Sequence, residues 1–492
     1  MRQQLPAIVF LLPLVTAICT PIVSLKNGRL YRPMALAAVG AMAVAAVVNL
    51  FSVFRYGEIR YAFGGWAPPI GIEWVADELA AVMAAALSVV GLICLIYSGQ
   101  MTPPELEKQG PAIYTLILLL LAGLTGIVFA GDLFNIFVFL EVAALAGYAL
   151  VGVAGGKALV SAFRYLILGA LGASLYLLGV GYFYAVTGTL NMADLAQRVP
   201  EMMTSKAVIV GLSFMFIGLG IKMALMPLHG WLPDAYTLAP SAVSPILASL
   251  LTKVSLLAWI RIVFWVVGGS SDIGALHILD LLWILGALAS LAGAFLALTQ
   301  QNLKRMFAYG GVSHIGVILI GIGQGSQTGL VGGLFYLIND AVMQATLFAI
   351  AGVAIYQYGV ENLDDAAVLR RGAPWMLAWL IISAMSMIGL PPTGGFFAKW
   401  YIVLSAIESG NFAAVVAIAG STLLTMAYFM RLFGRIFRDE KRATGKSHPH
   451  WPETPLTIRV SLGALVSAII ALGVWSDTIV NALTGATRSL GL

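Results

Sequence analysis

Charged side chains are scarce in this sequence. Asp, Glu, Lys and Arg together make up 10% of the 492 residues, whereas 60% of the residues are hydrophobic. So few charges cannot cover the surface of a water-soluble globule of this length. The mean hydropathy of +0.94 supports the same conclusion. A soluble globular fold is excluded, and we expect a polytopic membrane protein.

Cysteine is almost absent too. Cys19 and Cys94 each lie inside an apolar stretch, so neither a disulfide framework nor a metal-ligand spacing is expected. The sequence has no glycine-rich phosphate loop and no Ser/His/Asp spacing typical of a nucleophile. The net charge of +5 is not gathered into a basic patch with interleaved aromatic residues. We therefore expect no catalytic residue, no metal, no cofactor and no nucleic-acid partner, and we do not expect the chain to be an enzyme by itself.

What the sequence has in abundance is apolar stretches long enough to cross the roughly 30 Å of hydrocarbon in a bilayer. We interpret the first of them as a retained helix and not as a signal peptide, because Ile18 is not the small residue that cleavage before Cys19 would prefer. The pattern predicts an all-α polytopic membrane protein of about fourteen transmembrane helices. The predicted spans lie near residues 5–24, 34–54, 76–97, 112–130, 132–153, 161–187, 207–239, 241–266, 276–299, 305–323, 329–357, 375–409, 412–437 and 458–482.

Lysine and arginine are unevenly divided between the two sets of loops that fourteen spans create. One set, which includes the basic loop after the thirteenth span, holds 17 of the 27 cations. Because such an excess marks the cytoplasmic side, both termini are expected on the non-cytoplasmic side of the cell inner membrane. Three lysines, Lys222, Lys253 and Lys399, remain inside the predicted spans. The opposite set of loops holds Arg2, Arg55, Arg60, Arg198, Lys206, Arg261 and Arg488.

Two predicted spans, 207–239 and 375–409, are too long for one straight crossing, and both contain proline in the middle. Pro227 and Pro233 cannot donate backbone hydrogen bonds, so the helix that carries Lys222 is expected to open there. Spans four to eight and spans nine to thirteen begin about 164 to 173 residues apart, and the two long spans hold the same place in each set. This pattern is typical of two inverted five-helix repeats with discontinuous helices near the midplane.

The chain divides accordingly into four predicted segments, and no soluble domain or long linker interrupts them. They are an N-terminal three-helix segment over 1–111, a first repeat over 112–266, a second repeat over 276–437, and a cytoplasmic loop with the final helix over 438–492.

Glu141 and the three lysines inside the spans are the first candidates for function. A carboxylate with about nine apolar or small residues on each side needs a cation, and Lys222 is the natural partner, although such a pair could also be purely structural. No acidic residue lies within a helical turn of Lys253 or Lys399, and an ammonium at the centre of a span costs roughly 2.5 to 3.5 kcal/mol. Lysines in such surroundings can exchange protons, so we expect both to be proton carriers that face protein or water.

Two histidines, a fourth lysine and an aspartate extend this set. His314 and His229 titrate nearest neutral pH and could pass protons between lysines, but each could equally be a packing residue. Lys304 begins the tenth span, either as a cytoplasmic anchor or as an entrance to the row of titratable groups. Asp340 is a carboxylate within an apolar span with no cation nearby in sequence, and it could bind a cation or hold a proton. The predicted proton path consists of Glu141, Lys222, Lys253, Lys304, His314 and Lys399, with His229 and Asp340 as accessory residues.

The segments around these residues resemble the antiporter-like membrane subunits shared by respiratory complex I, membrane-bound hydrogenases and multisubunit Mrp cation/proton antiporters. The resemblance extends over essentially the whole chain. It implies fourteen helices with two inverted repeats, a buried Glu141–Lys222 pair that modulates Lys253, and a hydrated proton path completed by the later His and Lys groups. The motifs that carry it are FLEVAALAGYAL with Glu141, IKMALMPLHGWLPDAY with Lys222, SPILASLLTKVSLLAWIR with Lys253, NLKRMFAYGGVSHIG with Lys304 and His314, and LPPTGGFFAKW with Lys399.

Within that family the chain looks most like the D subunit of Mrp antiporters. Its length and Lys399, where one complex I relative carries Glu, are similar to that group. The resemblance then implies a proton-translocating subunit of a cation/proton antiporter, with sodium as the expected cation and other membrane subunits of a hetero-oligomeric complex as partners in the lipid bilayer. Two alternatives stay open: a proton-pumping subunit of a redox complex, and a structural subunit that does not conduct.

One segment departs from the family pattern. Many members carry His and sometimes Lys in the eleventh span, where this chain has Asp340 and Gln344 in LINDAVMQATLF. The route of protons through this helix is therefore not implied by the resemblance.

Overall fold

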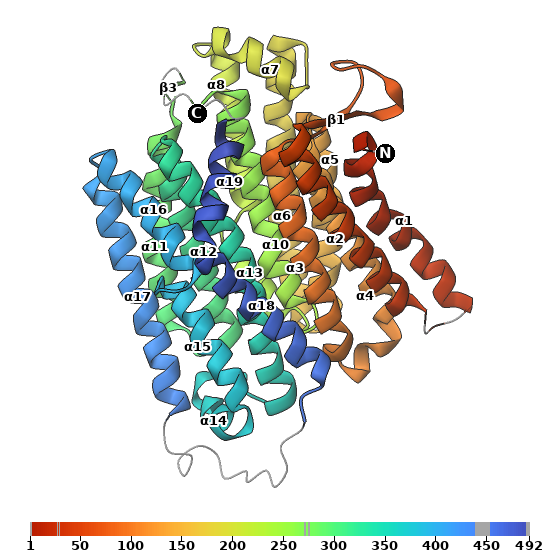
Figure 1. The fold of residues 1–492 in the computed structure, drawn as a ribbon, viewed down its shortest axis with the longest axis vertical. Coiled ribbons are helices and arrows are strands. Elements are labelled where there is room, and N and C mark those ends of the chain that lie inside the picture. The colour runs from red at the N-terminus through yellow and green to blue at the C-terminus, as the bar shows by residue number, and fades with distance from the viewer. Residues whose placement is uncertain are drawn as a thin grey trace.

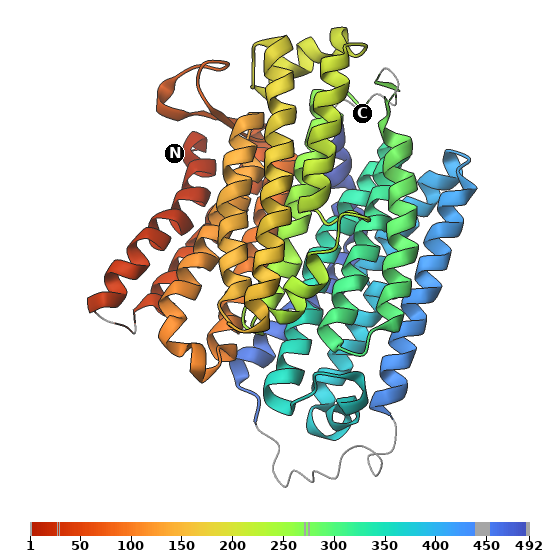
Figure 2. The ribbon, with the colours of Figure 1, turned by 180° about the vertical axis from the view of Figure 1, so that it is seen from behind.

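The computed structural model describes residues 2–26, 28, 30–269, 272–273, 276–437 and 453–488 as a bundle of long helices (Figures 1 and 2). Apolar runs form helices because hydrocarbon offers no hydrogen-bond partner, so each segment must satisfy its own backbone N–H and C=O groups. Twelve helices in the described ranges are long and apolar enough to cross a membrane. They are α1 (Leu5–Lys26), α2 (Tyr31–Tyr56), α3 (Glu78–Met101), α4 (Gly110–Phe129), α5 (Leu133–Gly152), α6 (Lys157–Thr187), α10 (Ser244–Arg261), α11 (Ile278–Thr299), α12 (Leu303–Gly323), α13 (Gln327–Tyr358), α17 (Phe412–Ile436) and α18 (Leu456–Val474).

Two further crossings are discontinuous helices, as the prolines predict. The first consists of α8 (Lys206–Lys222) and α9 (Leu232–Leu238), and the second of α15 (Pro374–Ile388) and α16 (Gly394–Glu408). Between α8 and α9, the indole N–H of Trp231 donates a hydrogen bond of 2.8 Å to the carbonyl of Ile221. This bond satisfies one of the carbonyls that the end of α8 leaves without a helical partner. The described chain thus contains the fourteen crossings that the hydropathy pattern predicts.

Shorter elements join the crossings. Two antiparallel hairpins, which hydropathy did not predict, pair β1 (Ile59–Ala62) with β2 (Glu73–Ala76) and β3 (Asp272–Ile273) with β4 (Leu276–His277). In the first hairpin Ile59 lies opposite Ala76. The remaining short helices are η1 (Arg2–Gln4), η2 (Phe63–Gly65), η3 (Pro104–Gln109), α7 (Met192–Arg198), η4 (Val199–Met202), the π-helix η5 (Ile262–Val266), η6 (Leu363–Val368), α14 (Leu369–Gly372) and α19 (Ser476–Arg488).

The two predicted repeats pack their helices in the same order. In the first repeat α4 packs on α5, α5 on α6, α6 on α8 and α9, and α10 on α4. In the second repeat α11 packs on α12, α12 on α13, α13 on α15 and α16, and α17 on α11. Because each repeat has an odd number of crossings, the second has the opposite orientation to the first. The predicted inverted repeats with discontinuous helices are confirmed.

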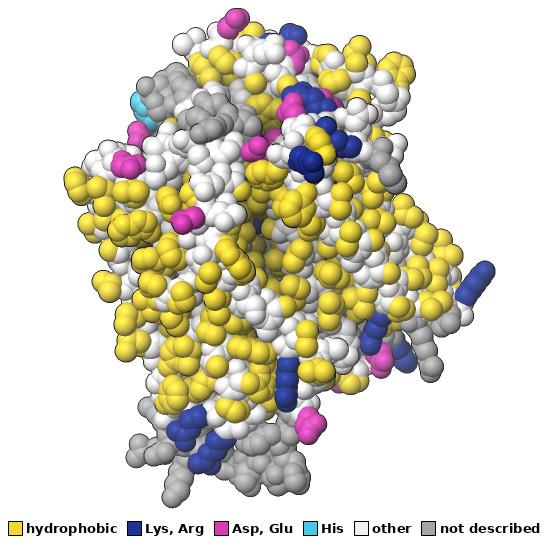
Figure 3. Space-filling view, in the orientation of Figure 1, with side chains coloured by type: hydrophobic (Ala, Val, Ile, Leu, Met, Phe, Trp, Pro, Cys, Tyr) yellow, Lys and Arg dark blue, Asp and Glu magenta, His cyan; other side chains and the backbone are white. Residues whose placement is uncertain are grey.

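Helices α10, α12 and α13 form the centre of the bundle. Every residue of α10 is buried, and so are most residues of α12 and α13. Figure 3 shows apolar side chains over the middle of one face and most of the charged ones near its two ends, which is the distribution that a bilayer requires. Because α10 carries Lys253, α12 carries His314 and α13 carries Asp340, these groups lie in the best-shielded part of the protein.

The beginning of α1 and the end of α19 lie at the same end of the bundle in Figure 1, as an even number of crossings requires. The assignment of this end to the non-cytoplasmic side stays a prediction, and so does the division of the chain into four segments. The basic loop predicted after α17 falls on residues 438–452, which lie outside the described residues.

Candidate functional site: a buried row of ionisable groups

The first ion pair of the site joins α5 to the end of α8. The ammonium of Lys222 lies 3.5 Å from Oε1 of Glu141, and it donates a hydrogen bond of 3.2 Å to the hydroxyl of Tyr148. Lys222 is buried, whereas 31% of the Glu141 side chain is exposed. The pair that the sequence predicts is therefore present. The Glu141 side chain is partly exposed, although the oxygen that faces Lys222 is buried.

Aromatic side chains attach this pair to the first broken crossing. The ring of Tyr165 packs edge-on against Tyr148 and stacks on Trp231, with ring centroids 4.4 Å and 4.0 Å apart. Trp231 in turn holds the carbonyl of Ile221, the residue before Lys222. The position of the Lys222 ammonium thus depends on the packing of the break.

The second ion pair lies at the centre of the bundle and joins α10 to α13. The ammonium of Lys253 lies 2.7 Å from Oδ2 of Asp340 and donates a hydrogen bond of 2.8 Å to the carbonyl of Ala248. Only 3% of the Lys253 side chain is exposed and none of the Asp340 side chain is. Charges this deeply buried are stable only when they are paired and hydrogen-bonded. The acidic partner that Lys253 lacks along its own helix is supplied by a residue far away in the sequence.

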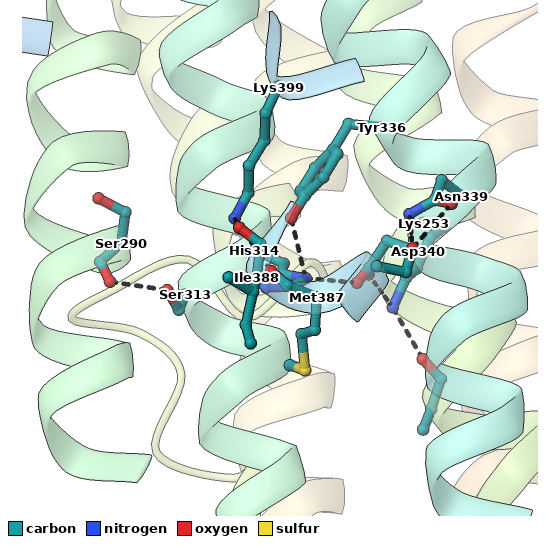
Figure 4. Close-up of polar contacts among 12 residues, drawn as sticks. Lys253, Ser290, Ser313, His314, Tyr336, Asn339, Asp340, Met387, Ile388 and Lys399 are labelled. Carbon is teal, nitrogen blue, oxygen red and sulfur yellow. Dashed lines mark hydrogen bonds and ion pairs between the residues drawn. The ribbon is translucent and has the colours of Figure 1, made fainter. Parts of the chain in front are cut away.

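Asp340 also contacts a histidine, so the ion pair is part of a row of side chains in contact. Its Oδ1 lies 3.1 Å from Nδ1 of His314, and the hydroxyl of Tyr336 lies 3.3 Å from the same nitrogen (Figure 4). His314 is 1% exposed. Asp340 therefore lies between an ammonium and an imidazole, which is the most central place in the site and not the accessory one that the sequence suggested.

Lys399 lies on the second broken crossing, at the end of this row of side chains. Its ammonium donates hydrogen bonds of 3.0 Å and 3.1 Å to the carbonyls of Met387 and Ile388, the last residues of α15 (Figure 4). It also lies 5.8 Å from the centre of the Tyr336 ring, a cation–π distance. Within the described chain no carboxylate pairs with Lys399, so backbone carbonyls freed by the break stabilise the charge.

A small cavity adjoins Lys253. Its volume is about 10 Å³, roughly the space that one water needs. Tyr236, Thr252 and Gln344 line it, and each of them has a buried polar atom without a hydrogen-bond partner in the described structure. Such atoms are costly unless water or another polar group reaches them. The cavity thus offers Lys253 a polar neighbourhood outside its ion pair.

Lys304 and His229 lie beside this row. The ammonium of Lys304 is buried and donates hydrogen bonds of 3.0 Å to the carbonyl of Ala239 and to the hydroxyl of Ser244, so it is not a surface anchor. His229 is half-buried, with its ring 6.2 Å from that of Tyr309. Among the described residues, no hydrogen bond or ion pair joins either side chain to Lys253 or to His314.

One buried ion pair was missed by the sequence analysis. Arg261, counted among the loop cations, is 1% exposed and lies 2.5 Å from Oδ2 of Asp77, at the start of α3. It also donates a hydrogen bond of 2.7 Å to the carbonyl of Val128. The loop assignment of Arg261 is wrong because the end of α10 packs against α3 and α4, where Asp77 and the carbonyl of Val128 contact its guanidinium, and does not lie in solvent. The position of Arg261 at the end of a predicted span does not indicate that other helices bury it.

Sequence reasoning also missed three tyrosines beside the charged groups. The hydroxyls of Tyr148 and Tyr336 contact Lys222 and His314, and Tyr236 lines the cavity next to Lys253. Tyr148, Tyr236 and Tyr336 were hidden among the apolar residues of their spans, although a tyrosine hydroxyl inside a membrane usually marks a hydrogen-bond partner. Within the described residues no group of three or more His, Cys, Asp or Glu side chains is placed to hold a metal ion. The arrangement consists of groups that can donate and accept protons.

Known membrane proteins are similar to this chain in sequence and in structure. Residues 130–425 match the family model described as NADH:quinone oxidoreductase/Mrp antiporter, transmembrane. The chain is 38% identical to the N subunit of NADH-quinone oxidoreductase from Desulforudis audaxviator, with 98% of each chain covered. It is 34% identical to the D subunit of the Na(+)/H(+) antiporter from Alkalihalophilus pseudofirmus, with 85% of this chain and 84% of that protein covered. A chain of the archaeal membrane-bound sulfane sulfur reductase has a similar structure, with a TM-score of 0.92 and 29% identity over 99% of this chain and 98% of that one.

Proposed function

Because this chain belongs to the NADH:quinone oxidoreductase/Mrp antiporter family of membrane subunits, we propose that it moves protons along its buried row of ionisable side chains. It is an antiporter-like membrane subunit of the kind found in Mrp and complex I-type assemblies, and other membrane subunits are its partners. The observation that carries the proposal is the contact of Lys253, Asp340 and His314 at the centre of the bundle. Proton transfer requires exchangeable groups that contact one another and are shielded from lipid, and these three side chains meet both conditions.

A relay through this contact leaves the net charge unchanged over a full cycle. His314 takes up a proton at Nε2 and passes the proton on Nδ1 to Asp340, which neutralises the carboxylate and leaves the Lys253 ammonium without its counter-ion, and His314 then returns to its first tautomer. Lys253 then releases a proton toward the cavity lined by Tyr236 and Thr252, and Asp340 passes its own proton to Lys253. The ion pair is restored and one proton has moved from the His314 side to the cavity side. The same steps in reverse carry a proton the other way.

The Glu141–Lys222 pair is suited to drive this relay. Its carboxylate is partly exposed, so a neighbouring subunit or an entering proton can change its charge. When Glu141 is neutralised or moves away, the positive charge of Lys222 is no longer balanced and repels protons at Lys253. The two ion pairs are then coupled through space.

The parent complex that we propose is a cation/proton antiporter, with sodium as the cation. The 34% identity to the D subunit of an Na(+)/H(+) antiporter supports it. A redox-driven proton pump is the second candidate, and the 38% identity to the N subunit of a quinone oxidoreductase favours it. Proton movement in inverted membrane vesicles distinguishes them: the first predicts uptake or release on addition of sodium chloride alone, the second only on addition of a reductant.

Lys253→Met in the assembled complex tests the proposal. The side chain keeps its length and loses its proton, so we expect proton movement in vesicles to fall below one tenth of wild type while the other subunits still co-purify. Lys206→Met is the matched control, because Lys206 is exposed at the start of α8 and should leave transport unchanged. Normal transport by Lys253→Met would refute the relay. Normal transport after Glu141, Lys222 and Lys253 are all neutralised would support a structural subunit instead.

A further inference from the structure

A polar pocket lies at the start of α6, outside the row of buried groups. Its volume is about 230 Å³, and it opens where the first turns of α6 pass α9. Figure 2 shows α6 as a long helix at the outside of the bundle. The lining residues are Lys157, Val160, Ser161, Arg164, Asp234 and Leu238.

The pocket has an excess of positive charge. Nη1 of Arg164 lies 3.4 Å from Oδ2 of Asp234, and Nη2 of Arg305 lies 3.2 Å from Oδ1 of the same carboxylate. Lys157 also lines the pocket, so the lining holds two cations and one anion, and Arg305 lies beside that anion. The Arg164 side chain is 66% exposed, and ion pairs at such exposed positions contribute about 0 to 1 kcal/mol. Arg164 can therefore turn to another anion at little cost, and Arg305 still balances Asp234.

A buried hydroxyl with no partner also lines the pocket. Ser161 is 4% exposed, and its Oγ makes no hydrogen bond in the described structure. A serine in a helix commonly donates to a carbonyl one turn earlier, and this one does not. Its hydroxyl is available as a donor to an acceptor that enters the pocket between Lys157 and Arg164.

The surroundings of the pocket are apolar. Leu159, Val160 and Phe163, on the first two turns of α6, are all more than half exposed. An Arg with such neighbours on a bilayer-facing helix extends toward the headgroup layer. The charge excess and the apolar rim together favour a ligand with an anionic head and a hydrocarbon tail.

We propose that this pocket binds the phosphate group of an anionic phospholipid. The phosphate oxygens accept hydrogen bonds from Lys157, Arg164 and Ser161, and the acyl chains lie against Leu159 and Phe163. Basic pockets between transmembrane helices commonly bind anionic headgroups. The proposal does not depend on proton transport. It does connect lipid to the first broken crossing, because Asp234 belongs to α9.

Native mass spectrometry of the full chain in detergent tests this site. Phosphatidylglycerol and phosphatidylcholine with identical acyl chains are titrated separately, and we expect tighter binding of phosphatidylglycerol. Each cation near an anionic headgroup contributes about a fivefold gain in affinity. The double variant Lys157→Gln/Arg164→Gln should therefore lose about 25-fold in affinity for phosphatidylglycerol. Ser161→Ala removes one hydrogen bond to the phosphate and should lose about fivefold.

Arg198→Gln is the matched control, because Arg198 forms an exposed pair with Asp194 near the other end of α6. It should change the affinity by less than twofold. Lys157→Gln alone, which leaves the Arg164–Asp234 pair intact, should lose about fivefold and separates binding from any effect on folding. Equal binding of the two lipids, or equal losses in the double variant and in Arg198→Gln, would overturn the proposal and leave an acidic side chain of another subunit as the occupant. Displacement of the lipid by millimolar inorganic phosphate would also overturn it and would assign the pocket to free phosphate.

Discussion

Removal of the carboxylate of Asp340 is the most direct test of the central ion pair. Asp340→Asn keeps the shape of the side chain and leaves the Lys253 ammonium buried without a counter-ion. At an effective dielectric constant of about 20, two unit charges 2.7 Å apart attract by about 6 kcal/mol. Part of that attraction offsets desolvation, and loss of one partner of a buried pair costs about 3 to 5 kcal/mol. The protonated state of Lys253 loses this amount of stabilisation.

The same free energy determines the expected loss of transport. Since each 1.36 kcal/mol is a factor of ten, about 3 to 5 kcal/mol corresponds to roughly two to four orders of magnitude in an equilibrium constant. We expect proton movement by Asp340→Asn to fall at least 100-fold, below detection by a fluorescent pH probe in inverted vesicles. Asp194→Asn, at a partly exposed carboxylate on α7 outside the row of buried groups, is the control that should transport normally.

A double variant separates the ion pair from other effects of the substitution. Lys253→Met/Asp340→Asn contains no unpaired charge, so the thermal stability that Asp340→Asn loses should largely return, while transport stays absent. The two substitutions should therefore be coupled by about 2 kcal/mol or more in a double-mutant cycle of complex unfolding. Losses of stability that simply add, or normal transport by Asp340→Asn, would refute the reasoning.

Three further predictions concern the ends of the row and the missed pair. Glu141→Gln should lower proton movement about three- to tenfold and cost about 1 to 3 kcal/mol of unfolding free energy, because the buried Lys222 ammonium then keeps only its hydrogen bond to Tyr148; complete loss of transport would show that Glu141 carries protons itself. Lys399→Met should abolish transport without loss of assembly, as measured by co-purification of the partner subunits, and retained transport would exclude Lys399 from the path. Arg261→Met should destabilise the chain by about 3 to 5 kcal/mol in thermal unfolding, and Asp77→Asn/Arg261→Met by less; equal losses would mean that the backbone bonds of Arg261 outweigh its ion pair.

Much of the fold could be predicted because the bilayer restricts what a chain can do. An apolar run must become a helix, and prolines in the middle of a run that is too long for one straight crossing favour a break, so both broken crossings and the order of the repeats follow from residue types and spacing. Proline alone is not enough, because Pro13 and Pro21 lie within the continuous helix α1. The hairpin β1–β2 could not be found in this way, since it lies in the short polar stretch between two spans. The contacts of Arg261 with Asp77 and with the end of α4 were missed for a different reason, because they depend on how the helices pack.

The candidate site was predictable in its members and not in its connections. A charge within an apolar span must face protein or water, which identifies Glu141, Lys222, Lys253 and Lys399 from composition alone. The pairing of Glu141 with Lys222 was predicted because no other cation lay in a plausible place. Asp340 has no cation near it in sequence, so its importance relative to the other candidate residues could not be predicted.

The sequence alone determined that this protein is a helical membrane bundle with two interrupted crossings and with charges inside it, because burial of an unpaired polar group in hydrocarbon costs several kcal/mol whatever the fold. Only the tertiary structure decided which charges meet. Asp340 lies on α13, distant in sequence from both Lys253 and His314, and the packing of α10, α12 and α13 places its carboxylate 2.7 Å from the first and 3.1 Å from the second. An electrostatic contact depends on distance through space, which side-chain identity does not encode.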